Sequence, residues 1–154
     1  MRISLIAVGK LGRSSEAALA FDYAKRATAP GRALGLAPVE IIEVEARKPG
    51  KAAEAGAILA RLGGARLIAC DEHGTQLTSR AFAARLAALR DDGVRELAIV
   101  IGGADGLDAS VLAAASETLA FGPQTWPHAL ARVMLAEQIY RAVSILAGSP
   151  YHRD

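Results

Sequence analysis

Short, strongly apolar runs alternate with segments of helical pattern along most of the chain, and this alternation constrains the fold more than any other feature. The β-like runs are 3–8, 39–44, 67–70, 97–101 and a brief one at 119–121. The helical patterns span 15–28, 52–62, 79–90, 108–118 and 127–147. Runs as apolar as LAIVI at 97–101 are typical of parallel strands that are covered on both faces. The order predicts an α/β fold, with a mostly parallel sheet of about five strands between helical layers.

Capping residues predict where the first two helices begin and end. Ser15 can cap the first helix, and Pro30 with Gly31 should stop it after Thr28. A Gly-Gly pair at 63–64 should end the second helix.

Composition limits the class of protein. The chain has 154 residues, of which 52% are hydrophobic, enough for one domain with a real core. The single cysteine, Cys70, excludes an intrachain disulfide and indicates a reducing, cytoplasmic location. A net charge of +2 is far below the basic excess of a protein held by phosphate contacts alone. Any RNA binding must therefore come from a local patch or from an oligomer.

Neither a metal site nor a membrane span is expected. His73, His128 and His152 show no metal-ligand spacing, and the lone cysteine adds none. The long C-terminal segment is interrupted by charged residues, so it lacks the run of about 20 apolar residues that a membrane helix needs.

Three segments that follow predicted strands should meet at one edge of the sheet. They read CDEHG at 70–74, GGADGL at 102–107 and GPQTWP at 122–127. In open parallel sheets, ligands bind beyond the carboxyl ends of the strands. The glycine-rich segment is neither a Walker A loop nor the G-x-G-x-x-G dinucleotide fingerprint, and a plain tight turn is its simplest interpretation. Convergence of the three segments is what predicts a site.

The first of these segments offers two possible chemical groups. Cys70 could act as a nucleophile, but no histidine stands out as its partner, and it is more typical of a small packing residue at a strand end. Asp71 and Glu72 could form a carboxylate pair, although adjacent residues in an extended segment point to opposite sides. A solvated or capping role is the alternative for both acids.

The C-terminal helical segment is apolar on every side, which predicts burial nearly all round, plausibly against a second subunit. His128 and Arg132 share one side just after Pro127, with Thr125 as a possible N-cap. There they could attract an anion such as RNA phosphate. Glu137 and Arg141, also four residues apart, are placed for an ion pair.

Several motifs together resemble a known family. They are IGGADGL at 101–107, TWPHALARVMLAEQIYRA at 125–142 and GSPYHR at 148–153, with ISLIAVGK and CDEHG followed by TSRAFA matching in order and spacing. These stretches, over essentially the full chain, resemble the small ribosomal RNA large-subunit methyltransferases of the SPOUT superfamily. Those enzymes methylate N3 of a pseudouridine in 23S rRNA.

The resemblance implies a single SPOUT methyltransferase domain over 1–154, with a C-terminal trefoil knot that periodicity alone does not reveal. It implies a homodimer that uses the C-terminal helix and acts on the assembled ribosome. A non-catalytic ribosome- or RNA-binding protein of the same fold is the alternative. A dinucleotide-binding enzyme is disfavoured because the fingerprint is missing.

The resemblance also implies S-adenosylmethionine as cofactor, held by the three strand-end loops. The matching positions are Cys70, Gly103, Gly122, Pro123, Gln124, Thr125, Trp126 and Pro127. The chain departs from the family pattern at His73, where arginine is common, and at Trp126, where phenylalanine is common. The first change puts an RNA or loop contact in question, whereas the second keeps an aromatic ring.

Finally, the resemblance assigns chemistry to the tail and RNA contacts to the long helix. Tyr151, His152 and Arg153 form the expected catalytic tail, in which His152 helps to remove the N3 proton and Arg153 stabilises the resulting anion. A frayed terminus without a role is the alternative, and water or the cofactor's carboxylate could also serve as base. The expected RNA contacts are His128, Arg132 and Arg141.

Overall fold

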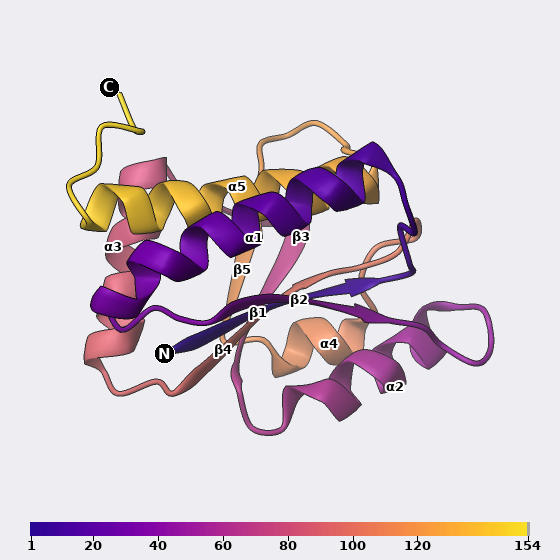
Figure 1. The fold of residues 1–154 in the computed structure, drawn as a ribbon. Helices are drawn as coiled ribbons and strands as arrows, with labels where there is room; N and C mark the ends of the chain where they lie inside the picture. Colours follow the sequence, from indigo (N-terminus) through magenta and orange to yellow (C-terminus); the bar gives the residue numbers. More distant parts are fainter. Residues whose placement is uncertain (154) are drawn as a thin grey trace.

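The computed structural model describes residues 1–153 and shows a five-stranded sheet with helices on both faces (Figure 1). The strands are β1 Arg2–Val8, β2 Val39–Val44, β3 Arg66–Gln76, β4 Glu96–Ile101 and β5 Glu117–Ala120. They pair in the order β2-β1-β4-β3-β5, and every pairing is parallel. The predicted α/β architecture is confirmed.

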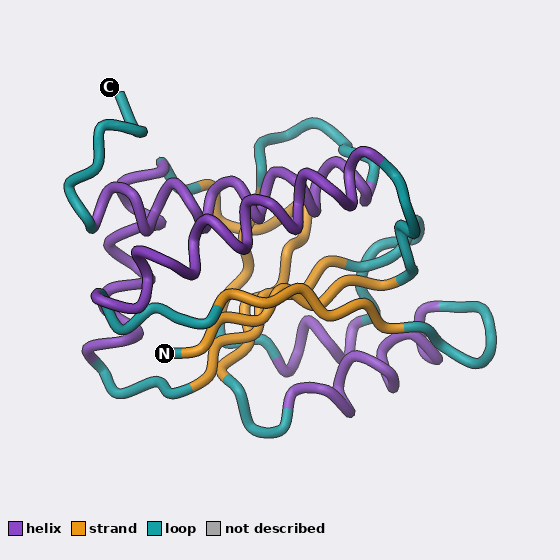
Figure 2. The backbone as a smooth tube through the Cα atoms, in the orientation of Figure 1, coloured by secondary structure: helices purple, strands orange, loops and turns teal. Residues whose placement is uncertain are grey.

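Five helices form the two outer layers (Figure 2). On one face lie α1 Ser15–Ala33, α3 Ser79–Asp91 and α5 His128–Leu146, and on the other lie α2 Lys51–Leu62 and α4 Ala109–Ala114. None of these helices is long and apolar enough to cross a membrane.

The central strands β1 and β4 have no polar face because both of their faces are buried. In β1, Ile3 and Leu5 point into the core beneath α1, α3 and α5, whereas Ile6 and Val8 point into the core above α2 and α4. In β4 the residues likewise alternate between the two cores, and all except Glu96 are buried. Since side chains in a strand alternate between faces, a strand covered twice must be apolar throughout.

Helix α1 differs from expectation at both ends. Its N-cap is Ser14 rather than Ser15, because the Ser14 hydroxyl accepts the Ala17 N–H at 3.1 Å. Pro30 lies inside the helix, which continues to Ala33. A proline so close to the end disturbs only the last turn, so it does not stop the helix where the sequence predicts.

Strand β3 is longer than predicted. It was expected to end at Cys70, but it continues to Gln76 through an irregularity between Cys70 and Thr75, both of which face Leu119 of β5. Gly74 makes this possible, since a methyl group there would lie 2.6 Å from the Leu119 carbonyl carbon. The CDEHG segment is therefore a bulge in a strand rather than a free loop.

The helix predicted at 108–118 is present, but it is shorter than predicted. Helix α4 ends at Ala114, and Ser116 then hydrogen-bonds the Leu67 carbonyl through both its amide and its hydroxyl, at 2.9 Å each. The chain thus joins the edge of β3 and continues as β5. Tertiary pairing overrides local helical propensity here.

Helix α5 is buried largely by its own chain. It packs against α1 and α3 over the sheet, with Leu135, Ile139 and Val143 fully enclosed. A second subunit is therefore not needed to explain the apolar character of these positions. Pro127, not Thr125, precedes the helix as its cap residue, and no side chain caps it.

Candidate functional site

Strands β4, β3 and β5 lie side by side toward the carboxyl edge of the sheet, where the sequence predicts a site. Cys70 of β3 is in register with Ile101 of β4 on one side and with Leu119 of β5 on the other. Gly103 and Gly122 follow β4 and β5 by two residues each. The structure therefore brings together the chain segments to which Cys70, Gly103 and the 122–127 loop belong.

The glycine-rich turn after β4 is tight and has a carboxylate beside it. Gly103 and Gly106 bridge each other, and the Gly106 amide donates to the Gly103 carbonyl at 3.1 Å. A methyl group on Gly102 would lie 2.6 Å from the Gly106 carbonyl carbon, whereas one on Gly103 would meet Oε2 of Glu54 at 3.0 Å. Glu54, in the first turn of α2, was not among the predicted site residues because nothing in its local sequence distinguishes it.

The loop between β5 and α5 is open to solvent. Pro123, Gln124, Thr125, Trp126 and Pro127 are all exposed, with 41% of Trp126 accessible. The Trp126 indole donates a 3.4 Å hydrogen bond to the Phe121 carbonyl, which holds the ring against its own loop. The loop therefore offers backbone groups and one aromatic ring at the edge of the sheet.

Cys70 is not a nucleophile in this setting. Burial raises the pKa of its thiol to about 12, so it stays protonated at neutral pH. The alternative role as a packing residue agrees with this environment, although Cys70 lies within β3 and not at its end. Beside it, Asp71 Oδ1 accepts the His73 amide at 2.9 Å, and the His73 ring is largely exposed.

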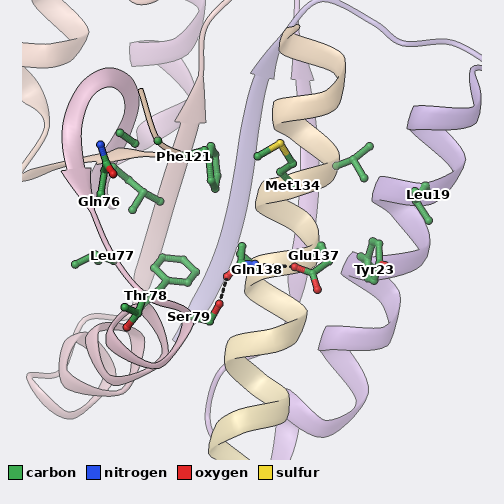
Figure 3. A pocket seen from close by; sticks show the side chains of 15 residues that line it. Leu19, Tyr23, Gln76, Leu77, Thr78, Ser79, Phe121, Met134, Glu137 and Gln138 are labelled. Atoms are coloured by element: carbon green, nitrogen blue, oxygen red, sulfur yellow. Dashed lines mark hydrogen bonds between the residues drawn. The ribbon is translucent and has the colours of Figure 1, made fainter. Parts of the chain in front are cut away.

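A groove of about 590 Å³ runs between α1, α5 and the end of β3 (Figure 3). Its apolar wall includes Leu19, Leu77 and Met134, and its polar end carries Glu137 and Gln138. Among the predicted cofactor positions, Gly122 alone lines it. The groove is thus adjacent to the strand-end site rather than identical with it.

Glu137 is the centre of a hydrogen-bonded chain that runs from the groove to the C-terminal tail. Ser79 of α3 donates to Gln138 at 2.8 Å, and Gln138 donates to Glu137 Oε2 at 2.8 Å. Oε1 of Glu137 accepts from Arg141 Nε at 2.9 Å and from the Tyr151 hydroxyl at 2.9 Å. The predicted ion pair of Glu137 with Arg141 is confirmed.

The same carboxylate orders the tail. Arg141 Nη1 lies 3.3 Å from Nδ1 of His152, and the Arg141 guanidinium sits 4.8 Å from the Tyr151 ring centroid. Burial raises the pKa of the Tyr151 phenol above its usual range, and hydrogen bonds to Tyr23 and Glu137 act in the same direction. Tyr151 is therefore a neutral side chain that holds the tail against α5. Arg153, two residues later, is exposed.

Aromatic rings from α1 and α5 also help to hold the tail in place. The Tyr140 and Tyr151 rings meet edge to face with centroids 4.6 Å apart, and Tyr23 lies 5.9 Å from Tyr140. The Arg26 guanidinium is 4.4 Å from the Tyr140 ring centroid, and it donates a 3.2 Å hydrogen bond to the Tyr140 hydroxyl. Sequence reasoning did not single out Tyr23, Arg26 or Tyr140, because the contacts of Tyr23 and Arg26 with Tyr140 cross more than a hundred residues.

Arg132 does not behave as the sequence predicts. Its side chain is 1% exposed; Nη1 pairs with Glu43 Oε1 at 2.6 Å, and Nη2 donates to the Val8 and Gly9 carbonyls at 3.1 Å each. Burial lowers the pKa of Arg132, against the opposing effect of Glu43. This placement argues against the predicted RNA contact, because the guanidinium is enclosed in the fold and both of its Nη atoms are bonded there. His128 is half-buried at the start of α5.

The described residues contain no group of three or more His, Cys, Asp or Glu side chains that could hold a metal ion. The features at this edge of the sheet are backbone turns and an aromatic loop, whereas the ordered tail follows the other end of α5. Such a site suits an organic ligand held by loops.

Comparison with known proteins decides the family. A family model described as "Predicted SPOUT methyltransferase" matches residues 1–152. The chain belongs to the SPOUT methyltransferase family. This SPOUT chain is 71% identical to "Ribosomal RNA large subunit methyltransferase H" of Caulobacter sp. (strain K31), over 100% of both chains. It is 53% identical to the protein of the same name from Ruegeria pomeroyi, over 99% of both.

A solved structure shares the fold at low sequence identity. The SPOUT chain superposes on a probable methyltransferase from Bordetella pertussis Tohama I with a TM-score of 0.53 and 19% identity, over 92% of this chain and 96% of the other. At this identity the likeness shows the fold alone. It agrees with the α/β fold described above.

Proposed function

We propose that this SPOUT methyltransferase transfers a methyl group from S-adenosylmethionine to N3 of a pseudouridine in 23S rRNA. It would act in the cytoplasm on the assembled ribosome, as a homodimer of one domain spanning 1–154. The main support for the proposal is that the Cys70, Gly103 and 122–127 segments meet at one edge of the sheet. The chain also matches proteins named as ribosomal RNA methyltransferases over its full length.

The strand-end loops suit an adenosine-containing cofactor. Gly103 has no side chain to block close approach, and the exposed 122–127 loop presents backbone groups together with the Trp126 ring. Glu54, beside Gly103, adds a carboxylate that can accept hydrogen bonds from hydroxyl or ammonium groups. S-adenosylmethionine, when bound, supplies an electrophilic methyl group on a sulfonium.

The C-terminal tail contains the polar side chains that we propose act on the pseudouridine base. Methylation at N3 needs the imide proton to leave and the resulting anion to be stabilised, since positioning and electrostatics dominate such steps. His152 and the exposed Arg153 follow the anchored Tyr151 and are the side chains proposed for this work. His128 and Arg141 remain proposed RNA contacts, whereas Arg132 is omitted because it is buried.

A homodimer is supported by large apolar side chains that are left exposed. Leu19 and Leu77 line the groove, and these two, Trp126 and Leu130 are each at least 40% accessible. Exposed apolar groups of this size are typical of surfaces that a partner covers. Sedimentation of the purified protein should give a mass near twice that of the monomer, and a monomer across micromolar concentrations would contradict this part of the proposal.

The reaction and its target can be tested together. Ribosomes from a strain that lacks this protein should gain one methyl group, on one pseudouridine of 23S rRNA, after incubation with the protein and S-adenosylmethionine. Mass spectrometry of the digested RNA measures this gain. Binding to ribosomes without any methyl gain, and without heat on titration with S-adenosylmethionine, would indicate a non-catalytic ribosome-binding protein instead.

A further inference from the structure

Exposed basic side chains gather at the carboxyl edge of the sheet, in the loops that follow β1 and β2. The set, which we term the basic rim, consists of Lys10, Arg13, Arg47, Lys48 and Lys51. We propose that the basic rim binds phosphate groups of the ribosomal RNA and so holds the RNA beside the strand-end loops. The proposal rests on the proposed function, because it names the surface through which that substrate is held.

The two loops concentrate positive charge. Residues 9–13 and 45–51 contain five basic side chains and one acidic side chain, Glu45, so their net charge is +4. The whole chain carries only +2, which means that the remaining residues are acidic overall. Arginine and lysine contacts to phosphate supply much of the affinity of proteins for a nucleic-acid backbone. A local patch of this kind is what RNA binding requires in a chain of such low net charge.

The two halves of the basic rim lie side by side because β1 and β2 are parallel neighbours. Val8 is in register with Val44, and the Gly9 amide donates to the Val44 carbonyl at 2.9 Å. Lys10 forms an ion pair with Glu45, which joins the two loops directly. In Figure 1 both loops lie at the end of the sheet away from the N-terminus. Segments more than thirty residues apart in the sequence therefore form one surface.

Three side chains of the basic rim have no counter-charge in residues 1–153. Arg13, Arg47 and Lys48 are exposed and form no ion pair or side-chain hydrogen bond within that range. Lys10, in contrast, already shares its charge with Glu45. A cation without a protein partner can bind a phosphate oxygen without first breaking an ion pair. These three side chains are therefore the ones most available to RNA.

The backbone under the basic rim is fixed from inside the fold. Nη2 of the buried Arg132 donates to the Val8 and Gly9 carbonyls at 3.1 Å each. Nη1 of Arg132 pairs with Oε1 of Glu43, and the same oxygen accepts the Leu11 amide at 3.0 Å. The loop after β1 is thus tied at three points, so that little conformational freedom is lost when it binds RNA.

The basic rim borders the loops that are proposed to hold the cofactor. Strand β1 lies beside β4 in the sheet, and Ala7 is in register with Ile101. Gly9, which begins the first loop of the rim, and Gly103, in the glycine-rich turn, each follow two residues later. Phosphate contacts fix the position of a nucleic acid but do not read its bases. The rim is therefore placed to hold the RNA backbone, while the base is left to the strand-end site.

Binding to ribosomes tests the basic rim without relying on methylation. In the full-length protein, Arg13→Gln, Arg47→Gln and Lys48→Gln together should weaken binding to purified ribosomes by about tenfold or more at physiological salt. The slope of log affinity against log salt should become shallower by about 2–3, because three phosphate contacts are lost. Arg47→Gln alone should change the slope by about 1, which keeps the test open if the triple variant folds poorly.

A matched control removes the same charge from the opposite edge of the sheet. Arg61, Arg66 and Arg95 are exposed and lie at the end of α2 and where β3 and β4 begin. Changing these three arginines to glutamine should leave both the affinity for ribosomes and its salt slope as in the wild type. In both triple variants the urea unfolding midpoint should stay at the wild-type position, since only exposed side chains are changed.

Several outcomes would overturn the proposal. Equal weakening in the two triple variants would mean that net charge governs binding, and wild-type affinity with an unchanged salt slope in the rim variant would show that the rim does not touch RNA. Methylation gives a second measurement, in which the rim variant should raise the KM for ribosomes more than it lowers kcat. If the wild type binds ribosomes but methylates nothing, the proposed function fails, and the comparison of the two triple variants still decides the role of the rim. A wild type without affinity for ribosomes would contradict both.

Discussion

The two ends of helix α5 each carry an arginine paired with a glutamate, and the two pairs do different work. Near the start of the helix, Arg132 is 1% exposed and reaches Glu43, which lies 89 residues away in β2. Near the end, the side chain of Arg141 is 25% exposed and pairs with Glu137 one turn earlier. One pair joins elements of the fold, and the other orders the tail.

The pKa directions of the two arginines reflect this difference. Burial lowers the pKa of Arg132 even though Glu43 raises it, whereas the hydrogen bond with Glu137 raises the pKa of Arg141. Removing an arginine from the first setting leaves buried acceptors without a donor, but in the second solvent can replace it. Residue type therefore predicts neither role, and surroundings decide both.

The largest effect is expected at the buried end. Arg132→Met should lower the free energy of unfolding by about 3–5 kcal/mol, because Glu43 loses its cationic partner and the Val8 and Gly9 carbonyls lose the Arg132 donor. Urea denaturation followed by circular dichroism measures this loss. Adding Glu43→Met to Arg132→Met should recover part of it, since the unpaired charge is gone. A loss below about 1 kcal/mol in the single variant would remove the distinction between the two ends.

At the tail end the effect should fall on activity. Arg141→Met is expected to slow methylation of ribosomes about 100-fold, as loss of positioning around a developing charge does. Its free energy of unfolding should change by about 1 kcal/mol or less, because the pair is partly open to solvent. Single-turnover assays beside urea denaturation give both quantities. Equal destabilisation by the two arginine variants would contradict the comparison.

A smaller effect is expected for the hydroxyl that anchors the tail. Tyr151→Phe keeps the ring contact with Tyr140 but removes the hydrogen bond to Glu137, at a cost of about 1 kcal/mol. Because the pKa of the phenol is raised, the hydroxyl is protonated at neutral pH, and its loss should not alter the pH dependence of methylation. Thermal unfolding and a pH–rate profile check these two statements. A changed profile would mean that Tyr151 titrates in the reaction.

The sequence predicts the layers of this fold well, because they follow from local patterns. The LAIVI run of β4 is apolar since both faces of the strand are covered, and this pattern survives in any α/β arrangement. Prediction from local patterns fails where distant contacts override local signals, as at the β3 bulge beside Leu119 and at the early end of α4. The expectation of a trefoil knot rests on the family resemblance alone, because periodicity holds no information on threading.

The candidate site was predictable only where it follows from local patterns. The convergence of the strand-end loops follows from parallel topology, and the pair of Glu137 with Arg141 follows from helical spacing. In contrast, the spacing of His128 and Arg132 suggested an exposed anion site, although Glu43 and two strand-end carbonyls enclose Arg132. Helical spacing gives the angle between side chains around an axis but not what packs against them.

The smallest expected effect separates the two ends by their response to salt. In about 1 M salt the Debye length falls to about 3 Å, so a pair open to solvent is screened while a buried pair is not. The stability change caused by Arg141→Met should therefore shrink by a few tenths of a kcal/mol, and that caused by Arg132→Met should stay the same within error. Urea denaturation of both variants and the wild type at low and high salt measures these differences. If both changes shrank equally, Arg132 would be as open to ions as Arg141, and its burial between α5 and the ends of β1 and β2 would not hold in solution.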